Sequence, residues 1–250
     1  MIVTPVEYRE PFWFKRDDLF GIAGARGGKA RTAWALAQGA TALVTAGARQ
    51  SPQVLIVASI AKALGIPCRC HVPAGALTPE LERAQQLGAT LVQHKAGYNS
   101  VIVARAREDA AGTGATLVPF GMECEEAVRQ TARQVVNLPP ECKRLVVPVG
   151  SAMSLAGVLT GLQKHEALAQ LPVLGVVVGA DPAKRLSRFC PLWWLQATLV
   201  KATEAYHDAA TTCELAGVQL DPIYEAKCIP FMRPGDLLWC VGHREALHAG

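Results

Sequence analysis

The stretch VVPVGSAMSLAGVLTGL (146–162) decides the fold class. It begins with an apolar run of strand length, passes through a loop of small residues, and continues as a helix that we expect to begin near Leu155. A strand that leads through a short loop into a helix is half of a βαβ unit, in which helices join parallel strands. The loop also directs backbone N–H groups and the positive end of the helix at one point, which suits an anion. The alternative is a plain turn in which Ser154 only caps the helix.

The same alternation of strand-length and helix-length runs continues on both sides of this stretch. We expect strands at 41–48, 67–73, 90–94, 116–120, 144–150 and 173–180. We expect helices at 30–38, 52–64, 79–87, 99–111, 123–136 and 155–169. This order predicts an α/β architecture of parallel sheets with crossover helices.

Length and composition indicate a globular protein. The chain has 250 residues, which is enough for one large domain or two small ones. Of these residues, 50% are hydrophobic and 18% are charged. The sequence has no apolar run near the roughly 20 residues that a membrane helix needs. Its first residues, MIVTPVEYRE, lack the pattern of a secretion signal, so we expect a cytoplasmic protein. The net charge of +4 permits an anionic ligand but does not indicate nucleic acid.

The 8 cysteines form no Cys-x-x-Cys pair. Only Cys68 and Cys70 are close in sequence, in a strand-like run where both would share one face. We therefore expect reduced, packed cysteines and no metal site.

A second stretch, GARGGKARTAWAL (24–36), places Lys29 behind three glycines and at the entry of a helix. A lysine in such a place either holds a phosphate as a point charge or forms a Schiff base with an aldehyde. A Walker loop would need glycine where Ala23 stands and Ser or Thr where Ala30 stands, so nucleotide hydrolysis is disfavoured. A Schiff-base lysine together with a phosphate loop at 150–154 points to pyridoxal phosphate.

Four blocks in chain order carry a resemblance to a known family. They are FWFKRDDLFG (12–21) with GGKAR (27–31), GARQSPQ (47–53), GSAMSLAG (150–157) and LDPIYEAK (220–227). They resemble segments of the fold type II, or tryptophan synthase β-like, pyridoxal-phosphate enzymes, and are most similar to aminocyclopropanecarboxylate deaminase and D-cysteine desulfhydrase. The resemblance implies a pyridoxal-phosphate-dependent lyase or deaminase that acts at the α- or β-carbon of a small amino acid.

The resemblance also implies a two-lobed architecture. We expect a larger cofactor-binding lobe formed by 1–49 and 119–250, and a smaller inserted α/β lobe formed by 50–118, with the cofactor in the cleft between them. The apolar composition and the paired Trp193 and Trp194 predict a homodimer.

The family pattern assigns roles to individual residues. Lys29 would carry the Schiff base, with apolar walls that lower the pKa of its ammonium group. Ser51 would relay a proton at the α-carbon, and Gln53 would face the substrate carboxylate. Tyr224 would lie over the reacting atoms as a nucleophile or proton donor. The phosphate would be held by Gly150, Ser151, Ala152, Met153 and Ser154. Without the pattern, Ser51 is a helix N-cap and Tyr224 a half-buried tyrosine.

Glu225 bears most on the type of reaction. In the deaminase branch a carboxylate at this position faces the pyridine nitrogen and keeps the ring protonated, which makes it the better electron sink. Such a ring is compatible with ring opening, deamination, racemisation or decarboxylation. The alternative is an exposed Glu225 that pairs with Lys227.

Two departures from the family pattern concern the tuning of the site. Gly28 stands where the family has an Asn before the lysine, and Pro52 stands where it has an Asn that contacts the 3-hydroxyl of the cofactor. Pro52 offers neither a side-chain donor nor a backbone N–H. These changes put the specific activity of the deaminase branch in doubt.

Two other functions fit the same residues. One is an enzyme whose amino acid is attached to a larger molecule, such as a nucleobase adduct in phage DNA hypermodification. A basic groove would favour that function, and it would be lined by Arg26, Arg31, Arg49 and Arg185. The other is a non-catalytic cofactor-binding protein, against which the joint presence of Lys29, Ser51 and Tyr224 argues.

Overall fold

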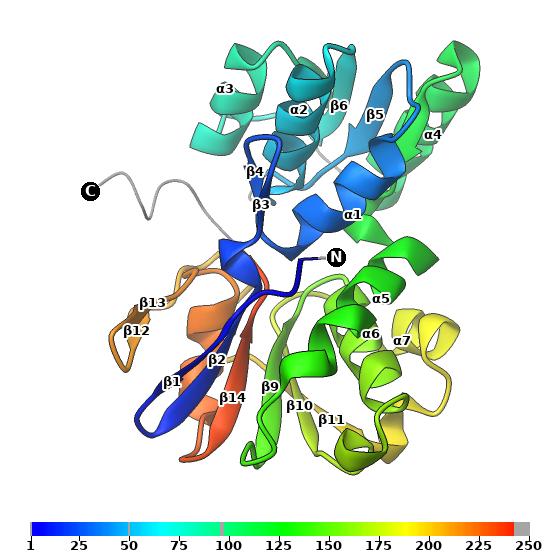
Figure 1. The fold of residues 1–250 in the computed structure, drawn as a ribbon. Coiled ribbons are helices and arrows are strands. Elements are labelled where there is room, and N and C mark those ends of the chain that lie inside the picture. Colours follow the sequence, from blue (N-terminus) through cyan, green and yellow to red (C-terminus); the bar gives the residue numbers. More distant parts are fainter. Residues whose placement is uncertain (1, 50, 96–97, 243–250) are drawn as a thin grey trace. The chain divides into compact units, whose positions relative to one another are not determined.

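The computed structural model describes residues 2–49, 51–95 and 98–242, which form two compact units (Figure 1). Within the described residues, unit 1 contains 2–20 and 124–242, and unit 2 contains 21–123. Each unit is an α/β layer structure with its own sheet. The predicted α/β architecture with parallel sheets is therefore confirmed.

The division differs from the expected one in the segments 21–49 and 119–123, which belong to unit 2 and not to unit 1. The segment 21–49 contains β5 (Leu43–Ala46), which lies inside the sheet of unit 2 and pairs with a strand on each side. A strand with two hydrogen-bonded neighbours belongs to the sheet that they form, so 21–49 is part of the smaller unit.

Unit 1 is built on a six-stranded sheet in the order β1-β2-β14-β9-β10-β11. The strands are β1 (Val6–Arg9), β2 (Phe12–Arg16), β14 (Asp236–Cys240), β9 (Arg144–Val149), β10 (Val173–Val177) and β11 (Ala197–Lys201). Only the hairpin of β1 and β2 is antiparallel. Strands β9 and β14 are buried on both faces, which accounts for their continuous apolar runs.

Three helices cover one face of this sheet: α5 (Glu125–Ala132), α6 (Met153–Leu162) and α7 (Ala183–Phe189). Helices α5 and α6 approach closely because Gly161 has no Cβ. A Cβ at this position would lie 2.6 Å from the carbonyl oxygen of Ala132. Both helices are shorter than expected from the sequence. The 3₁₀ turn η3 (Arg133–Asn137) follows α5, and η4 (Glu166–Leu168) lies beyond the end of α6.

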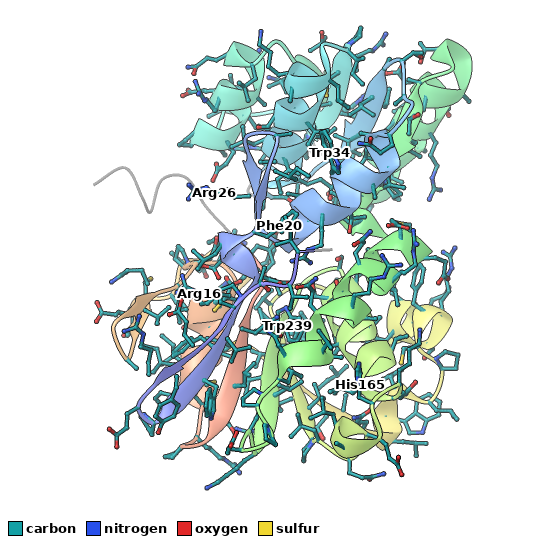
Figure 2. All side chains as sticks on the ribbon, viewed as in Figure 1. Arg16, Phe20, Arg26, Trp34, His165 and Trp239 are labelled. Carbon is teal, nitrogen blue, oxygen red and sulfur yellow. The ribbon has the colours of Figure 1, made fainter. Side chains whose placement is uncertain are left out.

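The other face of the sheet packs against η6 (Glu225–Phe231). The core on this side includes Phe14, Val146, Cys228 and Leu238. The remaining short elements of unit 1 are η1 (Asp17–Leu19), η5 (Trp193–Leu195), β12 (Glu214–Leu215) and β13 (Val218–Gln219). Trp239 of β14 is fully buried, and its Nε1 donates a hydrogen bond of 3.2 Å to Asp17 Oδ2 (Figure 2).

Unit 2 is built on a four-stranded parallel sheet in the order β7-β6-β5-β8. Its further strands are β6 (Cys68–Pro73), β7 (Thr90–His94) and β8 (Thr116–Val118), with the small hairpin β3 (Gly21–Ile22) and β4 (Ala25–Arg26). Its helices are α1 (Gly28–Ala37), α2 (Gln53–Leu64), α3 (Pro79–Gln86), α4 (Asn99–Thr113) and the turn η2 (Phe120–Met122). The expected strands of this unit are confirmed.

Buried polar groups in unit 2 are mutually satisfied where β6 meets α4. His71 Nδ1 lies 2.8 Å from His94 Nε2, and His71 Nε2 lies 2.7 Å from Asp109 Oδ2. Arg69 contributes an ion pair of 3.0 Å to the same carboxylate. Every buried group here has a partner, so the cluster links β6, β7 and α4 and is structural.

The eight cysteines are free thiols. Cys68 and Cys70 lie on one face of β6 with their sulfur atoms 3.6 Å apart, as expected from the sequence. The described residues include no helix of the length and apolarity required to cross a membrane.

Candidate active site

The loop between β9 and α6 presents backbone N–H groups at the start of a helix. Its turn is completed by Ala152, whose φ of 74° lies in the left-handed region and which stands at the N-cap position without a side-chain capping bond. The helix begins at Met153, so Ser154 lies inside its first turn, and the alternative that Ser154 caps the helix is wrong. The open N–H groups and the helix dipole suit a phosphate at this point.

Tyr224 lies directly against this loop. The Oδ1 atom of Asp221 accepts hydrogen bonds from Ile223 N at 2.8 Å and from Tyr224 N at 3.1 Å, which fixes the backbone there. A Cβ on Gly150 would lie 3.0 Å from Tyr224 Cε1, so glycine leaves room for the ring. The structure thus brings together two predicted site residues, Gly150 and Tyr224, that are 74 positions apart in the sequence (224 − 150).

Tyr206 is a candidate site residue that no sequence motif indicates. Its hydroxyl lies 2.9 Å from the hydroxyl of Tyr224, and the two rings meet edge to face at 6.1 Å. Lys227 holds the Tyr206 loop, because its buried Nζ donates hydrogen bonds to the carbonyl oxygens of Ala205 at 2.7 Å and Tyr206 at 3.3 Å. Tyr206 belongs to an irregular loop with no motif, so only the fold reveals its position.

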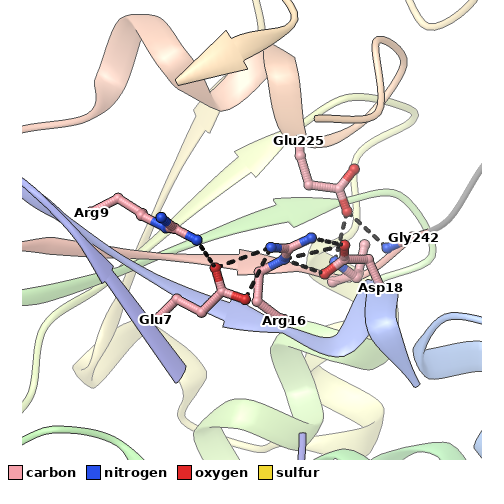
Figure 3. Close-up of polar contacts among 7 residues, drawn as sticks. Glu7, Arg9, Arg16, Asp18, Glu225 and Gly242 are labelled. Atoms are coloured by element: carbon pink, nitrogen blue, oxygen red, sulfur yellow. Dashed lines mark hydrogen bonds and ion pairs between the residues drawn. The ribbon is translucent and has the colours of Figure 1, made fainter. Parts of the chain in front are cut away.

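Glu225 is buried, with 1% of its surface exposed. Its Oε1 atom accepts hydrogen bonds from Val241 N at 2.6 Å and Gly242 N at 2.8 Å (Figure 3). Its Oε2 atom is buried and has no hydrogen-bond partner among the described residues. Lys227 is committed to the carbonyl oxygens described above, so the alternative of an exposed Glu225 paired with Lys227 is wrong.

Burial raises the pKa of Glu225 well above the ordinary value of a glutamate, and the charge of Asp221 raises it further. The neighbouring Arg16 does not offset this effect by a hydrogen bond to Glu225, because its guanidinium is paired with Glu7 at 3.2 Å and with Asp18 at 2.8 Å (Figure 3). Glu225 is therefore a buried acid with one oxygen atom available to a donor from a ligand.

These observations fit pyridoxal phosphate. Its phosphate matches the open N–H groups at the start of α6, and its protonated ring nitrogen is a donor that suits the unpartnered Oε2 of Glu225. Both features belong to unit 1.

Lys29 lies in the first turn of α1 in unit 2 and is half-buried. The helix follows Gly27, whose φ of 87° is a conformation that favours glycine. Ala30 N donates to Gly27 O at 3.0 Å, which closes the turn around the lysine. Lys29 is thus carried on a regular element, next to the buried Ala30 and Arg31.

Ser51 and Gln53 lie at the start of α2, close to the carboxyl end of β5. Ser51 is buried, and its Oγ accepts a hydrogen bond of 3.3 Å from Gln53 N. The side-chain amide of Gln53 points into the unit and donates to Thr45 Oγ1 at 3.0 Å and to Pro119 O at 2.7 Å. In this arrangement the Gln53 amide nitrogen is committed to the core, which argues against its predicted contact with a substrate carboxylate.

A sequence profile of the family described as "Pyridoxal-phosphate dependent enzyme" matches residues 4–227. The chain belongs to this family. The match confirms the resemblance found in the four sequence blocks, and it identifies pyridoxal phosphate as the cofactor.

Solved structures of pyridoxal-phosphate enzymes share the fold. An ACC deaminase homologue superposes with a TM-score of 0.80 at 20% identity, over 97% of this chain and 90% of that chain. The processed form of threonine deaminase isoform 2 from Solanum lycopersicum has a TM-score of 0.68 at 15% identity, over 99% and 86%. Maize serine racemase has a TM-score of 0.67 at 17% identity, over 96% and 87%. At these identities the likeness shows the fold alone.

One curated relative comes from a bacteriophage. It is the "O-seryl-dTMP PLP-dependent decarboxylase" of Salmonella phage ViI, 24% identical over 197 residues. The aligned part is 66% of this chain and 46% of the relative, so the chain spans about half the length of that protein.

Proposed function

We propose that this pyridoxal-phosphate enzyme breaks a bond at the α- or β-carbon of an amino acid, as a lyase of the deaminase type. The single observation that carries the proposal is the buried Oε2 of Glu225, which lacks a partner among the described residues. When bound, pyridoxal phosphate supplies the electron sink for the bond that breaks. A carboxylate at its ring nitrogen maintains the protonated ring, which accepts electrons best.

The residues of this chain take the following roles in the proposal. Lys29 holds the cofactor covalently, and the loop at 150–154 binds its phosphate. Ser51 and the Tyr206–Tyr224 hydroxyl pair supply and remove protons near the substrate carbon. The pairing of the hydroxyls lets Tyr206 stabilise whichever protonation state Tyr224 adopts.

The test is turnover of small α-amino acids with a β-leaving group or a strained ring. Ammonia and 2-oxo acid release would be measured for the wild type and for Tyr224→Phe. A positioned acid–base group contributes about 10²–10⁴ to rate, so the variant should lose that factor. Equal turnover by the two proteins would remove Tyr224 from the mechanism.

The second candidate is decarboxylation of an amino acid that is attached to a nucleotide. The phage relative favours it, because the name of that protein describes a decarboxylase of O-seryl-dTMP. The start of α2 favours it too. Pro52 has no N–H, Gln53 N faces Ser51 Oγ, and the Gln53 amide is turned to the core. A carboxylate that receives few hydrogen bonds is more readily released as CO₂.

The two candidates give different products. A deaminase releases ammonia from a free amino acid such as L-serine. A decarboxylase of the second kind breaks the bond between the α-carbon and the carboxylate, releases CO₂, and adds a proton to the α-carbon. Incubation with L-serine and with O-seryl-dTMP, followed by assays for ammonia and CO₂, separates them. Ammonia from serine supports the first candidate, and CO₂ from O-seryl-dTMP alone supports the second.

A further inference from the structure

Arg49 occupies the turn between β5 and α2 in unit 2. The turn is closed by a hydrogen bond of 2.9 Å from Ser51 N to Ala48 O, and Arg49 lies inside it. The turn stands at the carboxyl end of a parallel strand, where open α/β sheets bind their ligands. Arg49 is thus two positions before Ser51, the predicted substrate contact.

The guanidinium of Arg49 is held against the loop that follows β6. A Cβ on Gly75 would lie 2.5 Å from Arg49 Nη1 and 3.0 Å from Cζ, so the guanidinium packs directly against the backbone of Gly75. The hydroxyl of Thr78 donates a hydrogen bond of 3.0 Å to Arg49 O, which fixes the backbone. Both ends of the residue therefore have a defined place, unlike those of a solvated surface arginine.

The cation of Arg49 has no carboxylate partner among the described residues. Its Nε is buried and makes no hydrogen bond there. Other arginines of the chain pair with carboxylates at short distance: Arg16 with Asp18, Arg69 with Asp109, Arg105 with Glu108, Arg129 with Glu126 and Arg144 with Asp236. A buried donor without an acceptor is costly, so a ligand oxygen is the natural partner of this N–H.

We propose that Arg49 binds a phosphate group of the substrate. The proposal rests on the second candidate function, in which the amino acid is attached to a nucleotide. An arginine presents a planar fork of N–H donors that matches phosphate oxygens. The guanidinium reaches the loop after β6, whereas Ser51 stands at the start of α2. A ligand that contacts both residues therefore needs an anionic group in addition to its α-carboxylate.

The test is binding of dTMP to the full chain loaded with pyridoxal phosphate, measured by isothermal titration calorimetry. Loading the protein keeps the cofactor's own phosphate loop filled, so dTMP reports on a second phosphate site. Thymidine is the neutral control ligand. We expect dTMP to bind, thymidine to bind at least tenfold more weakly, and added salt to weaken the binding of dTMP. Absence of dTMP binding by the wild type would overturn the proposal.

Variants locate the site. Arg49→Gln should weaken dTMP binding about 10- to 100-fold, as expected for loss of a charge-assisted hydrogen bond. Arg49→Lys, which keeps the charge but loses the fork, should weaken it less. The matched control is Arg83→Gln, which removes the same charge from an exposed position on α3. Equal dTMP affinity in wild type, Arg49→Gln and Arg49→Lys would overturn the proposal, as would an equal loss in Arg83→Gln.

A short thymidine oligonucleotide distinguishes a phosphodiester from a free monophosphate. If Arg49 reads the backbone of DNA, the oligonucleotide binds at least as tightly as dTMP and shows the same loss in Arg49→Gln. If dTMP alone depends on Arg49, the site takes a nucleotide. Release of ammonia or CO₂ by the loaded wild type tests the proposed function separately. A failure of dTMP binding would therefore overturn the phosphate site without overturning the catalytic function, and the reverse also holds.

Discussion

Strand β14 has a buried carboxylate at each end, and the two ends differ in how these groups are satisfied. At its beginning, Asp236 accepts hydrogen bonds from Arg144 Nε at 3.1 Å and from Arg233 N at 2.8 Å. Just beyond its carboxyl end, two backbone N–H groups point at one oxygen of Glu225, and the other oxygen has no partner in the described part of the chain.

Asp236 is therefore satisfied by partners within unit 1, whereas Glu225 keeps one oxygen that we propose accepts a hydrogen bond from the cofactor. The ion pair of Asp236 with Arg144 stabilises the unit from within. Glu225 lies at the carboxyl end of the parallel strands, the edge at which ligands bind in α/β sheets. A folded protein tolerates an unsatisfied buried oxygen where a bound group completes its hydrogen bonding.

The largest expected effect is on the function of Glu225. Glu225→Gln keeps an oxygen for Val241 N and Gly242 N but removes the negative charge that maintains a protonated ring. Turnover of the amino-acid substrate should fall by about 10²–10⁴, and the absorption of the bound cofactor should shift. The cofactor should still bind, because the loop at 150–154 and Lys29 are unchanged. Unaltered turnover would remove Glu225 from the site.

The next effect is on stability at the other end of the strand. Asp236→Ala leaves the Arg144 guanidinium without its charge partner and should lower the free energy of unfolding by about 3–5 kcal/mol, measured by denaturant titration. Cofactor absorption of the folded variant should match the wild type. The double variant Arg144→Met, Asp236→Leu should recover most of the loss. A loss below about 1 kcal/mol in the single variant would contradict the structural role of Asp236. A shifted cofactor spectrum would show that Asp236 also affects the cofactor, as we propose for Glu225.

A smaller effect concerns the two tyrosines on the Glu225 side. Tyr206→Phe keeps the edge-to-face ring contact and removes one hydroxyl from Tyr224. Loss of one neutral hydrogen bond that stabilises the transition state lowers a rate constant about five- to tenfold, so kcat should fall by that factor. The pH profile of kcat should move because the partner of Tyr224 is gone. An unchanged pH profile would leave Tyr206 with a packing role only.

The smallest effect is on the pH dependence of stability. Burial raises the pKa of Glu225 well above 4.5, so the folded protein without cofactor holds a proton that the unfolded chain releases. The contribution of Glu225 to stability is therefore complete below pH 4.5 and is lost as the pH rises through the raised pKa. The slope is at most about 1.4 kcal/mol per pH unit.

This pH effect is measured as the difference between wild type and Glu225→Gln. Denaturant unfolding of both proteins without cofactor, at a series of pH values from 4 upward, gives the two curves. The wild type should lose stability relative to the variant as the pH rises, because Gln has no proton to release. Parallel curves would show that Glu225 is not held in its protonated form.

Most of the local structure is predictable from the sequence, because short-range patterns determine it. Strand β7 and helices α2, α3 and α4 can be predicted from apolar runs and from start signals such as Thr78 followed by Pro79. The order of strands across the unit 1 sheet is a different matter. Strand β14 inserts between β2 and β9, and such long-range pairing leaves no local signal. The assignment of 21–49 to unit 2 depends on the same kind of pairing.

The candidate site shows the same division. The loop at 150–154, Tyr224 and Glu225 belong to recognisable blocks and could be predicted, whereas Tyr206 lies in a loop without a motif. The orientation of the Gln53 amide could not be predicted either, since it depends on acceptors from Thr45 and Pro119, which are supplied by other segments of unit 2. The role of Lys29 stays a prediction that rests on its motif and its place in α1.

The most direct test of the central claim is to identify the lysine that holds the cofactor. The purified protein should show the absorption band of a protonated Schiff base, and reduction with borohydride followed by peptide mass spectrometry should place the pyridoxyl group on Lys29. Lys29→Ala should lose both the absorption band and the label. A protein that takes up no pyridoxal phosphate, or a label on any other lysine, would contradict the account.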